Sequence, residues 1–172
     1  MKKKIYLLAL SVVLVFSMVG CGKDDNKKEP ISVKEDLVEF VNEELPTISS
    51  YRSDAITAYN GYFVTDDVDT TALLTDLQTN IIPNMESYIA GLTAIEVETT
   101  EVISLKDLYM QGAQTQLDAM KMVEAAITEE NQEYLAQADA LILEAQGYYT
   151  QYETELKSLA AENNVNISTT AQ

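Results

Sequence analysis

The chain contains no histidine and no tryptophan, and Cys21 is its only cysteine. General acid–base catalysis near neutral pH most often uses histidine, and a serine or cysteine nucleophile usually needs a histidine beside it. Bundles that hold two metal ions use Glu-x-x-His pairs, and haem and Cys/His zinc sites need the same residue types. The sequence therefore predicts no catalytic residues, no metal site, no cofactor and no internal disulfide.

Positive charge is also scarce. Eleven Lys and Arg residues face 28 Asp and Glu residues, which gives a net charge of −17. Such a surface repels nucleic acid and anionic lipid headgroups, so we expect no nucleic-acid partner. A carboxylate pair about 5–9 Å apart in a cleft could still serve a glycosidase. With 28 acidic residues such pairs arise by chance, so we do not expect an enzyme.

Only one long apolar run is present, from Ile5 to Ser17, and it follows the three lysines at positions 2–4. The run ends in Met18-Val19-Gly20-Cys21, which is the layout of a secretory signal with a cysteine at the cleavage point. The alternatives are an ordinary signal peptide or a single membrane anchor, but a spanning helix needs about 20 apolar residues. Removal of residues 1–20 would leave 152 residues and, without those three lysines, a net charge of −20.

This stretch resembles the bacterial lipoprotein signal, whose lipobox ends in Gly or Ala before the cysteine that is lipidated. The resemblance implies that Cys21 carries the lipid and becomes the mature N-terminus. It also implies attachment to the extracytoplasmic face of the cell membrane, since two or more acyl chains give stable anchoring. The charged residues 21–31, ending near Pro30, then predict a flexible linker between the lipid and the folded body.

Apolar residues recur at steps of three and four over most of residues 32–164, and no stretch alternates long enough for a strand. Ser32-x-x-Glu35 predicts a capping box at the start of the first helix, and Asp69 and Thr128 predict N-caps of the second and fourth. We place the remaining turn at Glu96–Thr99, because one helix over 69–127 would be too long. The prediction is an all-α, up-down antiparallel four-helix bundle, followed by a frayed tail at 165–172.

The apolar series also predicts which side chains are buried. Tyr51 falls in the series of the first helix, and Leu117 and Leu141 fall in those of the third and fourth. We expect both leucines to be fully buried.

Part of this body resembles a group of small helical surface lipoproteins of Gram-positive bacteria, most of which are uncharacterised. The residues that carry the likeness lie in the second half of the chain. They are Ile95-x3-Thr99-x-Glu101-Val102, Leu105, Ala126-Ile127 and Leu159-Ala160-x-Glu162. The resemblance implies a helical fold and a location on the cell surface, and it transfers no catalytic or binding residue.

Two features suggest sites, but a structural explanation is preferred for both. Asp66-Asp67-x-Asp69 is a dense oxygen cluster that could bind Ca²⁺ weakly, yet it lacks the EF-hand spacing and also suits a helix-capping turn. Tyr148, Tyr149 and Tyr152 could stack on a ligand. They also extend the apolar series, where a tyrosine buries its ring and directs its hydroxyl to water.

The residues least suited to helices fall at matching positions along the four helices. If neighbouring helices are antiparallel about the predicted turns, then Pro46, Pro83, Gly112 and Gly147 share one layer of the bundle. The prolines would free the carbonyls of residues 42 and 79 and bend their helices, and the glycines would allow close packing. The preferred interpretation is a shared bend. The alternative is a layer, with Tyr109, Tyr148 and Tyr149, into which a ligand or a partner segment inserts.

The expected function is that of a non-catalytic, lipid-anchored envelope protein that binds or scaffolds a protein outside the cell. Its partners would be the membrane, through the lipid on Cys21, and an unknown envelope protein. The alternative is a ligand-binding lipoprotein with a pocket between helices for a small molecule or a cationic peptide. A filled core would favour the first function and an accessible apolar cavity the second.

Overall fold

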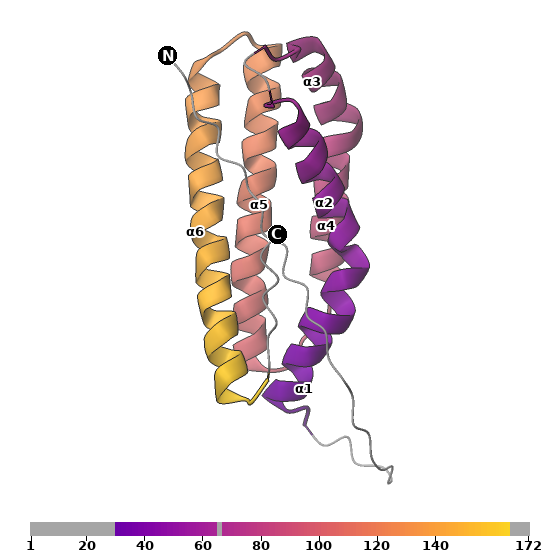
Figure 1. Cartoon of the computed structure of the whole chain (residues 1–172), viewed down its shortest axis with the longest axis vertical. Coiled ribbons are helices and arrows are strands. Elements are labelled where there is room, and N and C mark those ends of the chain that lie inside the picture. Colours follow the sequence, from indigo (N-terminus) through magenta and orange to yellow (C-terminus); the bar gives the residue numbers. More distant parts are fainter. Residues whose placement is uncertain (1–29, 65–66, 166–172) are drawn as a thin grey trace.

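The protein is an antiparallel bundle of four helical stretches, as predicted (Figure 1). The computed structural model describes residues 30–64 and 67–165, so Cys21 and Asp66 lie outside the described residues. The first stretch comprises α1 (Val33–Val38), η1 (Glu39–Glu44) and α2 (Leu45–Gly61), and the second comprises α3 (Thr70–Asp76), η2 (Leu77–Ile81) and α4 (Ile82–Ala94). The third and fourth are single helices, α5 (Thr100–Thr128) and α6 (Glu133–Glu162).

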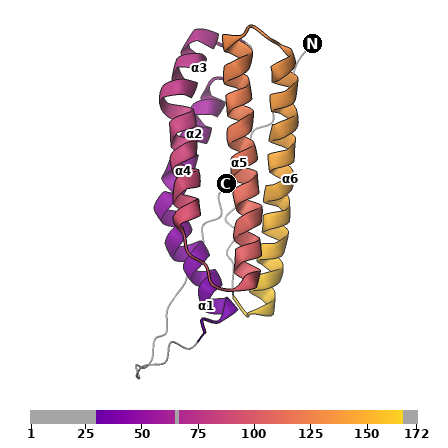
Figure 2. The same cartoon turned by 180° about the vertical axis from the view of Figure 1, so that it is seen from behind.

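The bundle consists of two helical hairpins laid side by side. α5 and α6 pack against each other over most of their length, and α2 packs against α4 (Figures 1 and 2). The hairpins meet mainly through α4 and α5, whereas α2 and α6 have little close backbone packing. No helix in the described part of the chain has an apolar stretch long enough to cross a membrane.

Two of the predicted helix starts are confirmed. The Ser32 hydroxyl accepts a hydrogen bond from the Glu35 N–H (3.2 Å), and the Glu35 carboxylate accepts one from the Ser32 N–H (3.1 Å). Asp69 Oδ1 accepts from the N–H groups of Thr71 (3.1 Å) and Ala72 (3.0 Å). Asp69 therefore caps α3, which is the structural role preferred for the aspartate cluster.

Both interior prolines lie next to π-helical turns. η1 ends one residue before Leu45-Pro46, and η2 ends just before Ile82-Pro83. The Leu45 N–H donates to the carbonyl five residues earlier instead of four, and the Ile82 N–H does the same. Proline has no N–H to donate, and its ring clashes with the carbonyl four residues before it. The wider turn is one way for a helix to accommodate that clash, and such turns are a known cause of helix bending.

The predicted turn at Glu96–Thr99 is confirmed, and side chains from other helices hold it. Residues 95–99 are not helical. Asp36, which is 3% exposed, accepts hydrogen bonds from the N–H groups of Glu98 (3.1 Å) and Thr99 (2.7 Å) and from the Thr99 hydroxyl (2.5 Å). Lys106 Nζ donates to the Ile95 carbonyl at the end of α4. A carboxylate thus lies at the start of α5 and an ammonium at the end of α4, where each suits the helix dipole.

The turn between α5 and α6 differs from the prediction. Thr128 is the last residue of α5 instead of the N-cap of the next helix, and its hydroxyl donates to the Glu124 carbonyl (2.9 Å). The turn is a Schellman motif, in which the N–H of Asn131 donates to the carbonyl of Ala126 (3.0 Å). Glu130 has the left-handed conformation that this motif requires, with φ of 54°. Glycine usually occupies that position, so the sequence lacked the residue that would have shown the helix end.

The core contains fewer large side chains on α6 than the apolar series predicts. Leu117 is buried as expected, but Leu141 is only partly buried. The fully buried face of α6 consists of three alanines, two tyrosines and one leucine: Ala138, Ala145, Tyr149, Tyr152, Leu156 and Ala160. The predicted frayed tail is wrong at its first residue, because Val165 is buried and packs on the core, and residues 166–172 lie outside the described residues.

We predict that Asp36→Asn destabilises the bundle by about 2–3 kcal/mol. The amide cannot accept all the hydrogen bonds that the buried carboxylate accepts, and hydrogen bonds to charged groups contribute about 1.5–3 kcal/mol. Urea unfolding followed by circular dichroism measures the change. Glu39→Gln, an exposed site close by in the same helical stretch, is the control and should change stability by less than about 0.5 kcal/mol. Equal stabilities of the two variants would contradict the assigned role of Asp36.

Candidate functional site

The only arginine of the chain is buried at mid-length between the two hairpins. Arg52, on α2, is 8% exposed. Its Nε donates to Oε1 of Gln116 on α5 (3.2 Å) and to the hydroxyl of Tyr149 on α6 (3.3 Å). The Tyr149 hydroxyl in turn donates to Gln116 Oε1 (3.2 Å), which closes a triangle of hydrogen bonds. Arg52 thus joins α2 to α5 and α6, on the side of the bundle where α2 and α6 have little backbone packing.

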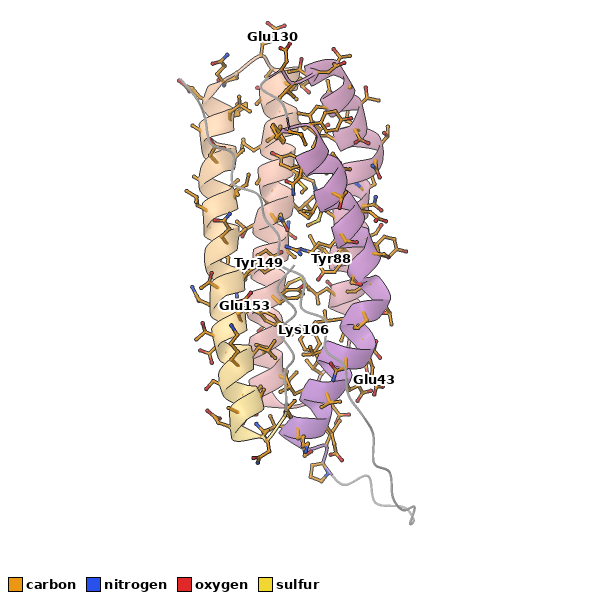
Figure 3. The ribbon with its side chains drawn as sticks, in the orientation of Figure 1. Glu43, Tyr88, Lys106, Glu130, Tyr149 and Glu153 are labelled. Carbon is orange, nitrogen blue, oxygen red and sulfur yellow. The ribbon has the colours of Figure 1, made fainter. Side chains whose placement is uncertain are left out.

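Ring contacts lead from Tyr149 of this triangle through Tyr109 to Tyr88 and Tyr152. The Tyr109 ring centroid lies 5.6 Å from that of Tyr149, 4.5 Å from that of Tyr152 and 6.3 Å from that of Tyr88. The guanidinium carbon of Arg52 lies 4.6 Å from the Tyr149 ring centroid, within the range of a cation–π interaction. Figure 3 shows Tyr88 and Tyr149 near mid-length, between the helices. We call these six residues the arginine–tyrosine cluster: Arg52, Tyr88, Tyr109, Gln116, Tyr149 and Tyr152.

The Tyr149 ring packs against a glycine, Gly112 on α5. A Cβ atom on Gly112 would lie 2.9 Å from Cε1 of Tyr149, which is closer than side-chain carbons approach. The ring therefore occupies the space that any other residue at position 112 would fill. The glycine thus makes room for an aromatic side chain of the neighbouring helix.

Burial determines the protonation of the cluster. It raises the pKa of Tyr149 to about 12, although the guanidinium of Arg52 acts in the opposite direction. Burial also raises the pKa of Tyr152 well above its usual value. For Arg52, burial lowers the pKa, but the negative charge that Tyr149, Tyr109 and Tyr88 would carry when ionised outweighs it, and the net shift is upward. At neutral pH the cluster is therefore one cation among neutral phenols.

The other residues of the predicted layer do not face this cluster. Pro46, Pro83 and Gly147 are exposed, and a Cβ on Gly147 would meet nothing within 4 Å. Tyr148 is partly buried, and its hydroxyl donates to Glu144 of its own helix (3.4 Å). Of the predicted set, the structure brings together Gly112, Tyr109 and Tyr149 only. The other candidate, Cys21, lies outside the described residues.

Three of the six members were not proposed from the sequence, namely Arg52, Gln116 and Tyr88. Tyr152 was considered only together with Tyr148 and Tyr149, and a structural role was preferred for it. One signal was present. The helical repeat that includes Ile48 and Ala55 passes through position 52 as well as position 51. Tyr51 was assigned to the core, but it is 43% exposed and Arg52 takes the buried position.

The cluster offers hydrogen bonding and a fixed positive charge, but no base that titrates near neutral pH. Asp36 is the only buried carboxylate among the described residues, and it accepts the hydrogen bonds of the α4–α5 turn. Within the part of the chain that the structure describes, no three Cys, Asp or Glu side chains gather closely enough to hold a metal ion.

Comparison with known proteins adds no family to this picture. No family model, no curated protein and no solved structure matches the chain. The four-helix body agrees with the helical fold that the resemblance to surface lipoproteins implies, and the agreement stops at the fold.

We predict opposite effects for two glycine-to-alanine substitutions on the α5–α6 hairpin. Gly112→Ala forces the Tyr149 ring out of place and should destabilise the protein by about 1–3 kcal/mol, as overpacking does. Gly147→Ala adds a methyl group to an exposed helical position and should stabilise it by up to about 1 kcal/mol. Thermal unfolding of both variants measures the difference. A similar effect of both would mean that Gly112 does not position the ring.

We also predict that stability falls between about pH 10 and pH 12. Burial raises the pKa of Tyr149 and of Tyr59 to about 12, and for Tyr59 the Asp139 carboxylate adds to the effect. In the unfolded chain a tyrosine ionises near pH 10, so the unfolded state loses protons first as pH rises. The stabilisation is complete below pH 10 and is lost as pH approaches 12. Urea unfolding at several pH values tests this, and Tyr149→Phe should reduce the slope. Constant stability up to pH 12 would contradict the assignment.

Proposed function

We propose that this chain is a non-catalytic, lipid-anchored protein on the extracytoplasmic face of a cell membrane, where it binds or scaffolds a protein partner. The signal-like stretch that ends at Cys21 supports the anchor and the location. The support for the anchor and for the location comes from residues outside the described part of the chain. The bundle supports the second half of the proposal, the mode of action.

The binding role is supported by one observation: the buried polar side chains form hydrogen bonds that hold the helices together. Three polar or charged side chains are buried among the described residues: Asp36, Arg52 and Gln116. Asp36 accepts hydrogen bonds from the α4–α5 turn, and the other two join α2 to α5 and α6. Each therefore serves the fold. The chemistry left for function is on the outer surface, which carries many carboxylates and few cations.

The alternative, a pocket between helices for a small ligand, has less support. The layer where we expected it is occupied by the Tyr149 ring, which lies against Gly112 and under Arg52. A ligand would have to displace that ring and break the hydrogen bonds of its hydroxyl. Leaving such buried groups unpaired costs about 1–3 kcal/mol for each group. A partner on the outer surface avoids this cost.

The linker would join the lipid to one particular end of the bundle. α1 begins twelve residues after Cys21, so the lipid would be joined to the end of the bundle that contains α1. α6 has 30 residues and is therefore about 45 Å long at 1.5 Å per residue. The opposite end carries the α5–α6 turn.

We predict that Cys21→Ser abolishes membrane attachment, because serine cannot take a thioether-linked lipid. In Triton X-114 phase separation the wild type should enter the detergent phase, and the variant should appear as an uncleaved precursor or in the aqueous phase. Ser17→Ala, upstream of the four-residue motif, is the control and should behave as the wild type. Equal partitioning of the wild type and Cys21→Ser would refute the anchor.

Cross-linking in cells, followed by mass spectrometry, tests the mode of action. The proposal expects cross-links from the anchored bundle to a second envelope protein. A chain that cross-links only to lipid or to itself would contradict it.

A further inference from the structure

The backbones of the first helical stretch and of α6 lie apart, although side chains from both belong to one core cluster. α1, η1 and α2 have little close backbone packing with α6. Leu37 of the first stretch and Leu156 of α6 are nevertheless members of the same cluster. Figure 1 shows α1 and the end of α6 at the same end of the bundle. We call the region between residues 38–52 and residues 149–160 the α2–α6 seam.

The Asn42 side chain lies on the side of the first stretch that is turned toward this seam. Asp36 marks the opposite side, because its carboxylate accepts hydrogen bonds from the α4–α5 turn. Val38 follows Asp36 by two residues and therefore lies about 200° around the helix from it. Asn42 follows Val38 by four residues, which is about one turn. Both side chains are partly buried, so this side faces the seam instead of solvent.

The amide group of Asn42 is buried without a hydrogen-bond partner. Its Oδ1 and Nδ2 atoms are both shielded from solvent, and neither forms a hydrogen bond with a described residue. The large majority of buried polar side-chain atoms in native structures are paired, so an unmet amide calls for a physical reason. An amide side chain both donates and accepts, as the N–H and C=O groups of a peptide backbone do. The backbone of an extended segment could therefore pair with it.

Val165, the last described residue, lies level with Asn42. The hydrogen bond between Arg52 and Tyr149 marks one level on two antiparallel helices. Asn42 lies ten residues before Arg52, which is about 15 Å at 1.5 Å per residue. Ala160 lies eleven residues after Tyr149, at a similar distance along α6. The Val165 N–H donates to the Ala160 carbonyl (2.7 Å), which holds Val165 at that level.

A segment that continues from Val165 begins inside the seam and is long enough to follow it. Val165 is 8% exposed and packs on the cluster that contains side chains of the first stretch. α6 ends in a Schellman motif with Asn164 at φ of 55°, and the same motif at Glu130 reverses the chain between α5 and α6. The seven residues 166–172 could extend over about 23 Å at 3.3 Å per residue, which exceeds the distance to the level of Arg52.

The sequence of residues 166–172 suits an extended segment on an apolar surface. Alternate side chains of an extended chain lie on the same side, so Ile167, Thr169 and Ala171 would share the side of Val165, which is buried. The positions between them are all polar. Isoleucine and threonine favour extended backbone conformations. The segment carries no charged side chain, so the acidic bundle does not repel it.

We propose that the α2–α6 seam is a docking surface for residues 166–172 of this chain, bound in extended form. The Asn42 amide bonds to the backbone of this segment, and Ile167 packs on Leu45, which is partly buried. Leu45 lies three residues beyond Asn42, about 5 Å along the helix. Ile167 lies two residues beyond Val165, about 7 Å along an extended chain. The docked segment joins two helical stretches whose backbones have little direct packing.

The continuity of the chain selects this occupant. Val165 already packs at the end of the seam near α1. A segment of a partner or of a second copy would have to enter past it, whereas residues 166–172 follow directly from it. The inference goes beyond the proposed function and does not rest on it, because it concerns the bundle and neither the anchor nor an external partner.

Disulfide trapping in the full chain carrying Cys21→Ser tests the position of the segment, because that chain has no other cysteine. Leu45→Cys with Ile167→Cys should form an intrachain disulfide under mild oxidation, which peptide mapping by mass spectrometry identifies. Glu43→Cys with Ile167→Cys is the matched control, since Glu43 is exposed and lies close to the same level. The first pair should form at least about tenfold faster, because docking raises the effective concentration of one thiol beside the other. Equal rates would overturn the proposal.

The sign of a stability change tests the role of Asn42. Asn42→Leu removes the amide and nearly keeps the size of the side chain. Loss of an amide that bonds to the docked segment should lower Tm by about 2–4 °C. Loss of an amide that stays unpaired would raise Tm, because an unpaired buried amide opposes folding. A rise in Tm would therefore overturn the proposal.

Variants of the segment itself complete the test. Ile167→Ser should lower Tm by about 2–4 °C, and Ser168→Ala, on the other side of the segment, should change it by less than about 1 °C. The effect of Asn42→Leu should shrink when Ile167→Ser is also present, because both act through one docked segment. Full additivity of the two changes would contradict docking.

Two other occupants of the seam would also overturn the proposal. Self-association of the wild type that Leu45→Ser abolishes would assign the surface to a second copy. In cells, a disulfide from Leu45→Cys to another envelope protein, in place of the one to Ile167→Cys, would assign it to a partner. Neither result bears on the anchor, which detergent partitioning tests separately.

Discussion

The hydrogen bonds of one buried guanidinium join the two hairpins of this bundle at mid-length. Arg52 reaches from α2 to Gln116 on α5 and to Tyr149 on α6, where the backbones of α2 and α6 have little direct packing. A buried cation is costly unless its hydrogen bonds are made and its charge is balanced. Here the oxygens of Gln116 and Tyr149 accept hydrogen bonds from the guanidinium, which also lies against the Tyr149 ring, and Gly112 leaves room for that ring. The register of the hairpins therefore depends on a polar contact as well as on apolar burial.

Features set by a few neighbouring residues could be predicted from the sequence. The capping box at Ser32, the cap at Asp69 and the turn at Glu96–Thr99 are all found where local chemistry places them. The Thr128 cap was wrong because the motif that ends α5 uses Glu130 where glycine is usual. On α6, a ranking by hydrophobicity favours Leu141. The fully buried face of α6 instead carries alanines at positions 138, 145 and 160, and Leu141 is only partly buried beside it.

The candidate layer could be predicted only in part. Matching positions along antiparallel helices fix how far along the bundle a residue lies, but they do not fix which way its side chain points. Gly112 and Gly147 occupy matching positions along α5 and α6, yet Gly112 faces a neighbouring helix and Gly147 faces solvent. The direction of a side chain depends on the helical repeat, and that repeat was read from apolar residues alone. Arg52 satisfies the repeat but is charged, and charged residues are rarely buried. The central residue of the cluster was therefore invisible to a criterion based on hydrophobicity.

Charged residues inside the bundle and charged residues on its surface have different effects on the fold. Inside, Asp36, Arg52 and Gln116 each have hydrogen bonds that hold helices together, so their presence is explained by the fold. On the surface, mutual repulsion among carboxylates lowers stability. At Glu130 the local backbone conformation adds to that cost, although Asn164 shows that a better residue suits the same motif in this chain. A residue that the fold explains needs no further role. Glu130 has no such explanation, because its negative charge at the C-terminal end of α5 and its left-handed conformation both oppose the fold.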